Sequence, residues 1–228
     1  SMSGFWDFGP FGATIRRKII DFWRHELVQK EGYFEIFGAQ ILPKDVFVAS
    51  GHLENFNDPI VKCRKCQSVF RADLLLNDAT GNIVPESIST PEMDALIKKH
   101  KVKCSKCGSL DFEEVRKFNM MLKVDIVATG KQEAYLRPET CQTIFLAFDR
   151  IYKTMRSSLP LGIAQAGSSF RNEISPRNTL LRERELGQME LEVFFDPQKS
   201  NNVEGFEKIK DYKLNLLLFG EKNAKQVS

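Results

Sequence analysis

Four of the five cysteines form two pairs whose spacing suits a metal ion. Cys63 and Cys66 make one Cys-x-x-Cys pair, and Cys104 and Cys107 make the other. Four thiolates can bind Zn²⁺ tetrahedrally, which leaves no open position for a substrate. The pairs therefore predict a structural zinc site, with free thiols or disulfides as the alternatives.

The segment that carries these pairs is expected to be a small insert. From about Lys62 to Arg116 the sequence has few large apolar clusters, a polar stretch from Asn77 to Pro91, and a short helical pattern over Glu92–His100. A small unit with little apolar core usually needs a metal or another crosslink. We therefore expect the zinc ion to hold this insert together.

Polar side chains also alternate along a predicted β-hairpin. Its strands are expected from about Ile163 to Ile174 and from about Arg184 to Phe195. Alternate side chains of a strand share a face, so Arg171 lies beside Glu173 on the first strand. On the return strand, one face carries Gln188, Glu190 and Glu192, and the other carries Met189, Leu191, Val193 and Phe195.

Arginines at the turn of this hairpin suggest a chemistry for its polar face. Arg177, Arg182 and Arg184 lie in or next to the turn. A guanidinium binds two phosphate oxygens at once and stabilises charge that builds during displacement at phosphorus. The hairpin therefore predicts a nucleotide site, and a solvated hairpin with surface ion pairs is the alternative.

Helices and further strands must position these groups. Pro10 begins a helix of about six turns that Gly32 ends, and its apolar residues are Phe11, Ile15, Ile19, Phe22, Trp23 and Leu27. A β segment over Tyr33–Leu42 follows and is closed by Pro43. Periodicity and turn residues predict further strands over Phe118–Val127 and Glu133–Leu136, and helices from Pro138 toward Pro160 and over Val203–Phe219.

The remaining candidate residues carry weaker signals. His25, His52 and His100 lie apart without an evident partner, and Cys141 is expected to be a buried small hydrophobe on its helix. The lysines from Lys98 to Lys106 are expected to be a solvated face, with RNA contact as the alternative.

Composition bounds the class of protein. Hydrophobic residues make up 42% of the 228 residues and charged residues 28%, which excludes a disordered or collagen-like chain. The net charge of +3 names no partner. No apolar run approaches the roughly 18 residues of a membrane span, and no secretory signal is visible, so a reducing, cytoplasmic location without membrane contact is expected.

Two stretches of the sequence resemble the motifs of class II aminoacyl-tRNA synthetases. Phe170-Arg171-Asn172-Glu173, the arginine-rich turn and Gln188-Met189-Glu190 resemble motif 2. The long helix, Gly32-Tyr33-Phe34 and Pro43 resemble motif 1. Three further stretches look more narrowly like the α2-type glycyl-tRNA synthetases, namely Gly4–Pro10, Leu136–Gln142 and Ser169–Arg182.

The resemblance implies a fold and a division of the chain. The fold would be of the α+β class, an antiparallel sheet flanked by helices, interrupted by the small zinc-binding insert. Residues 1–62 would form the first part of the catalytic core with motif 1, 63–116 the insert, and 117–228 the second part with motif 2. No counterpart of motif 3 or of an anticodon-binding domain is found.

The resemblance also implies roles for single residues. Arg171 would grip the α-phosphate of ATP and act in catalysis, and Glu173 would accept from the adenine amino group. The rest of the ATP site would come from Asn172, Arg182 and Glu183. Glycine would be held by Glu139, Gln188 and Glu190. After the Arg-Pro-Glu-Thr stretch this chain has Cys141-Gln142-Thr143, where the family usually has Ala-Gln-Gly.

The function implied is that of a glycine–tRNA ligase, here as a catalytically incomplete part. ATP with Mg²⁺ would activate glycine to glycyl-adenylate, the glycyl group would pass to tRNA(Gly), and a homodimer would form through motif 1. One alternative is a class II synthetase for another small amino acid. Another is a non-catalytic, synthetase-like protein that binds RNA or a partner.

Overall fold

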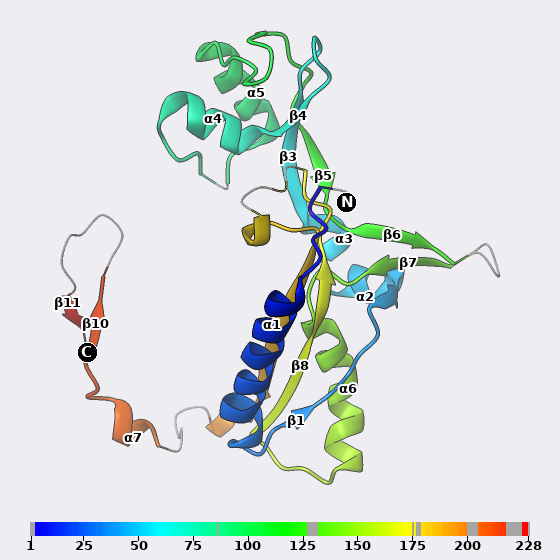
Figure 1. Ribbon diagram of the computed structural model, residues 1–228, viewed down its shortest axis with the longest axis vertical. Helices are drawn as coiled ribbons and strands as arrows, with labels where there is room; N and C mark the ends of the chain where they lie inside the picture. The colour runs from blue at the N-terminus through cyan, green and yellow to red at the C-terminus, as the bar shows by residue number, and fades with distance from the viewer. Residues whose placement is uncertain are drawn as a thin grey trace.

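The computed structural model describes residues 3–85, 87–126, 132–174, 176, 179–199, 205–217 and 225–227. Within them the chain forms three three-stranded sheets and one two-stranded sheet, with helices on the largest sheet and in the insert (Figure 1). None of the described helices is long and apolar enough to span a membrane.

The predicted hairpin forms the centre of the main sheet. Strand β8 (Leu161–Phe170) pairs antiparallel with β9 (Glu185–Phe194) and parallel with the short β1 (Phe34–Glu35). Strand β8 ends at Phe170, earlier than predicted, because the main chain then turns so that the Glu173 N–H donates to Arg171 O. Arg171 and Glu173 therefore lie beyond the ladder, and strand alternation does not place them.

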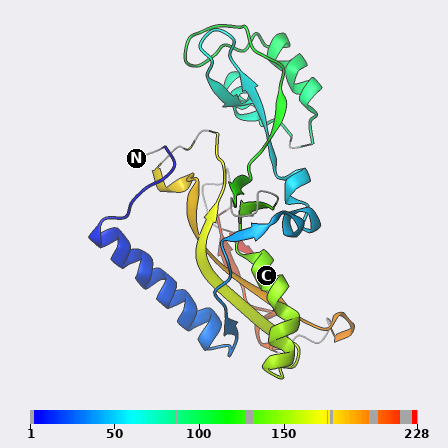
Figure 2. The same ribbon diagram turned by 90° about the vertical axis from the view of Figure 1, so that its right-hand side faces the viewer.

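Helices lie on both sides of this sheet, as Figure 2 shows. Helix α6 (Cys141–Thr154) packs Ile144, Ala147 and Ile151 against Leu161 and Ile163 of β8. It begins at Cys141 rather than at Pro138, with Thr140 as its N-cap. The other side faces α1 (Pro10–Trp23), which continues as the π-helical η1 (Arg24–Gln29). The predicted long helix is confirmed, yet α1 has no buried residue.

The chain between β1 and α2 differs from the single β segment that was predicted. It forms two short strands in different sheets, and between them Gly38 lies so close to Thr143 and Gln165 that a Cβ atom would overlap both. Strand β2 (Ile41–Pro43) pairs with β7 (Glu133–Leu136), which pairs with β6 (Leu122–Asp125). Two short helices follow β2, namely α2 (Lys44–Ala49) and α3 (His52–Asn55).

The insert has its own sheet and its own core. Strand β3 (Asn57–Lys62) lies between β4 (Val69–Arg71) and β5 (Arg116–Asn119). Helix α5 (Thr90–Lys99) confirms the predicted helix, and α4 (Ala72–Thr80) was not predicted. The expectation of a poor apolar core is wrong, because the helices close a buried cluster of Val61, Ala72, Leu75, Leu76, Met93, Ile97, Val102 and Val115.

Two further predictions change in the structure. The segment predicted as one strand over Phe118–Val127 is split between β5 and β6, and Val127 lies outside the described residues. The prediction of one helix over Val203–Phe219 is wrong. Among the described residues of that range only α7 (Phe206–Ile209) is helical, and β10 (Leu214–Leu216) pairs with β11 (Lys225–Val227). Leu214 and Leu216 alternate with Asn215, which is a strand period.

Candidate functional site

The register of the hairpin places its polar residues on one face. Gln165 lies opposite Glu190, and Gly167 lies opposite Gln188. Residues opposite one another in an antiparallel pair point to the same face. This face is the one that α6 covers farther along the hairpin, where Phe148 stacks on Phe194. The predicted polar face is thus confirmed, and it begins where α6 begins.

Arg137 is the buried centre around which this face is built. Its Nε donates to Ser168 O at 2.9 Å, and its Nη1 donates to Gln165 Oε1 at 3.1 Å and to Gly38 O at 3.3 Å. Burial lowers the pKa of Arg137 from its usual value, and the nearby Glu190 charge opposes that change. One guanidinium therefore joins β8 to the chain between β1 and β2.

Thr140 fixes the Glu190 carboxylate. The Thr140 N–H donates to Glu190 Oε2 at 2.6 Å, and the Thr140 hydroxyl donates to the same oxygen. Gln165 in turn donates from Nε2 to Thr140 O at 2.8 Å. The N-terminus of α6 and strand β9 are therefore locked together at the proposed glycine site.

Glu139 is the most heavily bonded carboxylate of the site. Its Oε1 accepts from His52 Nε2 at 3.0 Å, Gln142 Nε2 at 2.6 Å and Cys141 Sγ at 3.1 Å. The hydrogen bond from His52 is the main cause that holds the pKa of Glu139 at about 2, and burial opposes it. Glu139 is therefore ionised at neutral pH.

Two expectations are corrected here. His52 was expected to lack a partner, but it contacts Glu139. Cys141 was expected to be a buried hydrophobe on its helix, but its half-buried thiol lies within 4.8 Å of carboxylate oxygens of both Glu139 and Glu190. Burial, followed by the Glu139 contact, raises the pKa of Cys141. The first turn of α6 points to the site, not to the apolar core.

Arg171, the main predicted nucleotide residue, lies beside the main chain that leads into Glu139. Arg171 Nε donates to Pro138 O at 3.1 Å, and the Arg171 guanidinium carbon lies 5.7 Å from the centre of the Phe56 ring. The Phe170 N–H donates to Arg137 O at 2.9 Å. The main chain of Arg137 and Pro138 therefore joins the predicted ATP residues to the predicted glycine residues.

The other arginines of the hairpin divide between two roles. Arg182 Nε lies 3.7 Å from Glu173 Oε2, which is an ion-pair distance but too long for a hydrogen bond. Arg184 instead donates to Glu173 O at 3.0 Å and to Ser3 O at 2.8 Å, and so fastens the N-terminal segment. For Asn172 only a main-chain bond, to Met120 O, is recorded. Arg177 lies outside the described residues.

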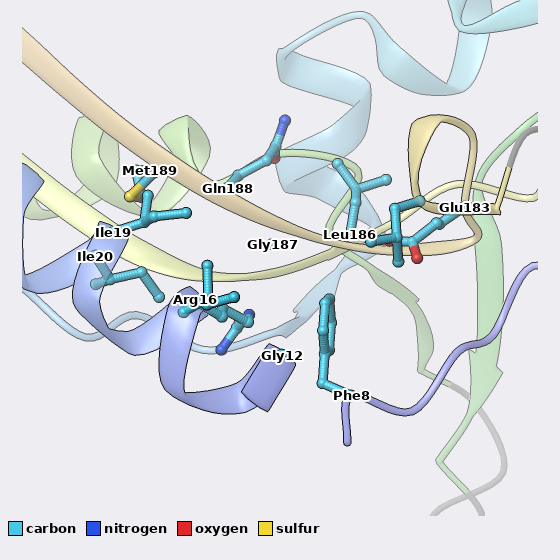
Figure 3. A pocket seen from close by; sticks show the side chains of 12 residues that line it. Phe8, Gly12, Arg16, Ile19, Ile20, Glu183, Leu186, Gly187, Gln188 and Met189 are labelled. Carbon is cyan, nitrogen blue, oxygen red and sulfur yellow. The ribbon is translucent and has the colours of Figure 1, made fainter. Parts of the chain in front are cut away.

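Glu183 lines a different hollow. A pocket of about 440 Å³ lies between α1 and β9, and Figure 3 shows Glu183 at one end of it with Phe8, Arg16 and Met189 along its walls. Met189 belongs to the apolar face of β9, so this pocket is on the opposite side of the sheet from Glu190. Glu183 thus borders this pocket, while the carbonyl oxygen of its neighbour Arg184 accepts from the Arg171 N–H at 2.9 Å.

Several buried polar atoms at the site lack a protein partner. Among the described residues these atoms include Arg137 Nη2, Gln142 Oε1, Ser169 Oγ, Glu173 Oε2 and Gln188 Oε1. An unpaired buried polar atom costs about 1–3 kcal/mol, so such atoms are rare except where they serve a function. They mark the same face that Glu139 and Glu190 occupy.

The four insert cysteines meet in one cluster. Cys63 Sγ lies 3.6 Å from Cys107 Sγ, and Cys66 Sγ lies 3.6 Å from Cys104 Sγ. Each pair is followed by a residue with left-handed φ, Gln67 at 60° and Gly108 at 72°. Hydrogen bonds from Ser68 lower the pKa of Cys66 to about 6. Four thiolates on a zinc ion at about 2.3 Å would lie about 3.8 Å apart, so the donor set and its spacing fit that ion.

Sequence reasoning missed His52 and the framework of Arg137, Thr140 and Gln165. Arg137 and Thr140 flank the Pro-Glu pair. Their position next to the predicted ligand Glu139 was a signal in the sequence that they help to position it. Gln165 had one too, because a glutamine in an apolar strand is seldom buried without partners. No local pattern linked His52 to Glu139, because the two residues are 87 positions apart in the sequence.

Comparisons with known proteins identify similar sequences. Residues 117–226 match the family model of the tRNA synthetase class II core domain (G, H, P, S and T). A glycine–tRNA ligase of Methanococcus maripaludis strain C7 is 43% identical over 95% of this chain, and one of Thermococcus gammatolerans is 46% identical over 93%. The chain spans 37% of the length of each of these relatives.

A solved structure supports the fold. The structure of the RNA binding domain of threonyl-tRNA synthetase from Cryptosporidium parvum Iowa II covers 92% of this chain with a TM-score of 0.53 and 20% identity. This chain covers 36% of that one. The expected resemblance is therefore confirmed: the chain is similar in sequence to glycine–tRNA ligases, its residues 117–226 match the class II tRNA synthetase core domain, and its fold has antiparallel sheets with flanking helices.

Proposed function

We propose that this chain supplies part of the active site of a glycine–tRNA ligase, which activates glycine with ATP and passes it to tRNA(Gly). The observation that carries the proposal is the junction at Arg137 and Pro138. It joins a fixed carboxylate pair, Glu139 and Glu190, to Arg171. A small zwitterion and a nucleotide would be held side by side at such a junction.

The glycine would bind at the carboxylate pair. Its ammonium would lie between Glu139 and Glu190, and Gln188 Oε1 would offer a further acceptor. Glycine has no side chain, so the site must also exclude larger amino acids, and the walls next to the carboxylates would do so by overlap. Loss of one methylene contact alone would discriminate by only about 1–3 kcal/mol.

The ATP would bind at the start of the motif-2 turn. Arg171 uses its Nε for Pro138 O, which leaves its two outer nitrogens for the α-phosphate. The buried Glu173 would accept from the adenine amino group, with Arg182 beside it, and Asn172 would border the same site. Glu183, which borders the α1 pocket, would complete the ATP site next to Arg182.

The chemistry would come from positioning and charge. A carboxylate oxygen of glycine attacks the α-phosphorus of ATP, the bond to pyrophosphate breaks, and glycyl-adenylate forms. A tRNA 3′-terminal hydroxyl then attacks the glycyl carbonyl, and AMP leaves. Arg171 would stabilise the charge that builds at phosphorus. Mg²⁺ bound with ATP would help neutralise the leaving pyrophosphate.

The insert would hold a structural zinc ion on Cys63, Cys66, Cys104 and Cys107. Their 3.6 Å sulfur distances and the four-sulfur donor set support it. A reducing compartment such as the cytoplasm would keep these thiols available.

A homodimer would form through α1. Phe11 is 87% exposed and Phe22 is 68% exposed, although both lie on the predicted apolar stripe of the helix. A helix with such a stripe normally buries it. The expected motif 1 interface would bury this stripe against the second subunit.

The test is amino-acid-dependent exchange of pyrophosphate into ATP, run with all twenty amino acids on the longest natural chain that contains this sequence. We expect exchange with glycine alone, and a higher apparent KM for glycine in Glu139→Gln. The control is Glu185→Gln, an exposed residue of β9 that should leave KM unchanged. Exchange with serine or proline instead would overturn the substrate, and no exchange would favour the non-catalytic alternative.

A further inference from the structure

His52 lies in a hydrogen-bonded chain that ends at the proposed glycine site. Ser50 Oγ lies 2.9 Å from His52 Nδ1, and His52 Nε2 lies 3.0 Å from Glu139 Oε1. An ionised carboxylate can only accept, so the His52 nitrogen that faces it must carry a proton. In the neutral ring Nδ1 then accepts from the Ser50 hydroxyl. Glu139 thereby selects the tautomer, and the Ser50 hydroxyl, which can donate or accept, completes the chain.

Two aromatic rings hold the imidazole. It packs edge-on against Phe47, with centroids 6.4 Å apart, and at a tilt against Phe56, with centroids 5.6 Å apart. Asn119 Nδ2 donates to His52 O at 3.2 Å and to Leu53 O at 2.9 Å. The His52 side chain is only 16% exposed. Rotation of the ring away from Glu139 would break this packing.

The three donors to Glu139 act on the same oxygen. His52, Cys141 and Gln142 all contact Oε1, and no hydrogen bond to Oε2 is recorded among the described residues. A carboxylate fixed through one oxygen presents the other in a defined direction. Glu139 Oε2 is therefore the atom that remains for a ligand with N–H donors.

We propose that His52 is a positioning residue for the amino acid: it fixes Glu139 through Oε1 so that Oε2 meets the ammonium group. This inference rests on the proposed function of Glu139. The same loop also reaches the nucleotide side, because the Phe56 ring that packs on His52 lies under the Arg171 guanidinium. Within this segment His52 thus contacts the proposed glycine side, and Phe56 contacts the nucleotide side.

The test compares His52→Ala, His52→Gln and Ser50→Ala in the pyrophosphate exchange assay. Hydrogen bonds to charged groups are strong enough that His52→Ala should raise the amino-acid KM about 10- to 100-fold. The ATP KM should stay within about twofold. His52→Gln retains a neutral N–H donor and should recover part of the loss. His100→Ala, an exposed histidine in the insert, is the control and should change neither constant.

A double-mutant cycle separates positioning from general damage. If His52 acts through Glu139, His52→Ala should add little to the effect of Glu139→Gln, because both changes remove one interaction. Additive effects, or equal rises of the ATP and amino-acid KM, would overturn the inference. The KM in this cycle is measured with whichever amino acid the enzyme activates. The cycle therefore still tests the role of His52 if that amino acid is not glycine. Should His52→Ala fail to fold, Ser50→Ala and His52→Gln carry the same comparison.

Discussion

Arg171 contacts a main-chain carbonyl and an aromatic ring, but no carboxylate contact is recorded for it among the described residues. Its charge is therefore free to act on a bound anion. We expect Arg171→Ala to lower the rate of amino-acid activation on the order of 100- to 1000-fold, as for loss of one charge-stabilising donor. Single-turnover formation of the adenylate measures this rate.

A conservative change sharpens the prediction for Arg171. Lysine keeps the charge but loses the two-pronged geometry, so Arg171→Lys should recover only part of the rate. Arg150→Lys, on the exposed side of α6, is the matched control. Full activity in Arg171→Lys would mean that a point charge suffices, and the proposed two-oxygen grip would then be wrong.

The acid stability of the fold should depend on Glu139. Its pKa of about 2 in the folded protein lies below its ordinary value of 4.5. A depressed pKa stabilises the fold fully above about 4.5, and that contribution is lost as the pH falls toward about 2. Because glutamine does not titrate, the free energy of unfolding of Glu139→Gln should fall less than that of the unchanged protein as the pH falls through this interval. Urea unfolding at neutral pH and at points between these two values measures it, with Glu185→Gln as the control.

Single residues show how far sequence reasoning reached. Glu139 and Glu190 could be singled out because they stand in recognisable stretches and because strands alternate. The partners that fix them could not. Thr140 reaches Glu190 across 50 residues and His52 reaches Glu139 across 87, and such pairs are determined by tertiary packing. Local sequence patterns therefore cannot predict these long-range pairs.

At the scale of elements, Gly38 lies between two short strands that join different sheets, where the chain passes close to α6 and β8. A Cβ at this position would lie 2.5 Å from Thr143 Cβ and 2.8 Å from Gln165 Oε1, both at the base of the proposed site. We expect Gly38→Ala to destabilise the fold by about 1–3 kcal/mol through overpacking. Denaturant unfolding measures the change.

Gly9 provides the comparison for this prediction. A Cβ at Gly9 would have no atom within 4 Å, and the backbone there is extended, with a φ of −65°, so Gly9→Ala should cost less than about 1 kcal/mol. If both substitutions lowered the free energy of unfolding equally, crowding would not be what distinguishes Gly38.

The elements also show which sequence signals were reliable. The β8–β9 hairpin and helix α1 were predicted because their periodicity runs without interruption. The Tyr33–Leu42 segment misled because a run of aromatic and branched residues looks like one strand, whereas the structure divides it into β1 and β2, which belong to different sheets. Helix α4 was missed because its apolar residues, such as Leu75 and Leu76, gain meaning only from the α5 helix that packs on them.

For the whole molecule, the core of the insert changes what metal removal should do. Eight buried apolar residues close this unit without any cysteine among them. The purified chain should contain about one zinc ion, and Cys104→Ser should release it, since tetrahedral sites tolerate few vacancies. Chelation should lower the melting temperature of the insert while the circular dichroism of its helices is largely retained.

Cys141→Ser is the control for metal content, because Cys141 lies in the proposed glycine site and not in the insert. Four freely titrating thiols at Cys63, Cys66, Cys104 and Cys107 without bound zinc would contradict the metal site. Complete unfolding on chelation would contradict the independent core instead. The two results are distinct, so the experiment tests the ion and the core separately.

The last prediction concerns the exposed apolar residues of α1. Phe11 and Phe22 are not among the residues that line the pocket between α1 and β9, and both are exposed within the described part of the chain. In a two-fold dimer each residue would be buried twice, once in each subunit. Burial of one phenylalanine contributes about 1.5–3 kcal/mol. Phe22→Asp should therefore raise the dimer dissociation constant at least about 100-fold, since both copies lose their contact. Ala13→Asp adds the same charge to an exposed position of the same helix and should leave association unchanged. Sedimentation velocity over a range of concentrations measures the outcome, and an unaltered dimer in Phe22→Asp would place the interface elsewhere.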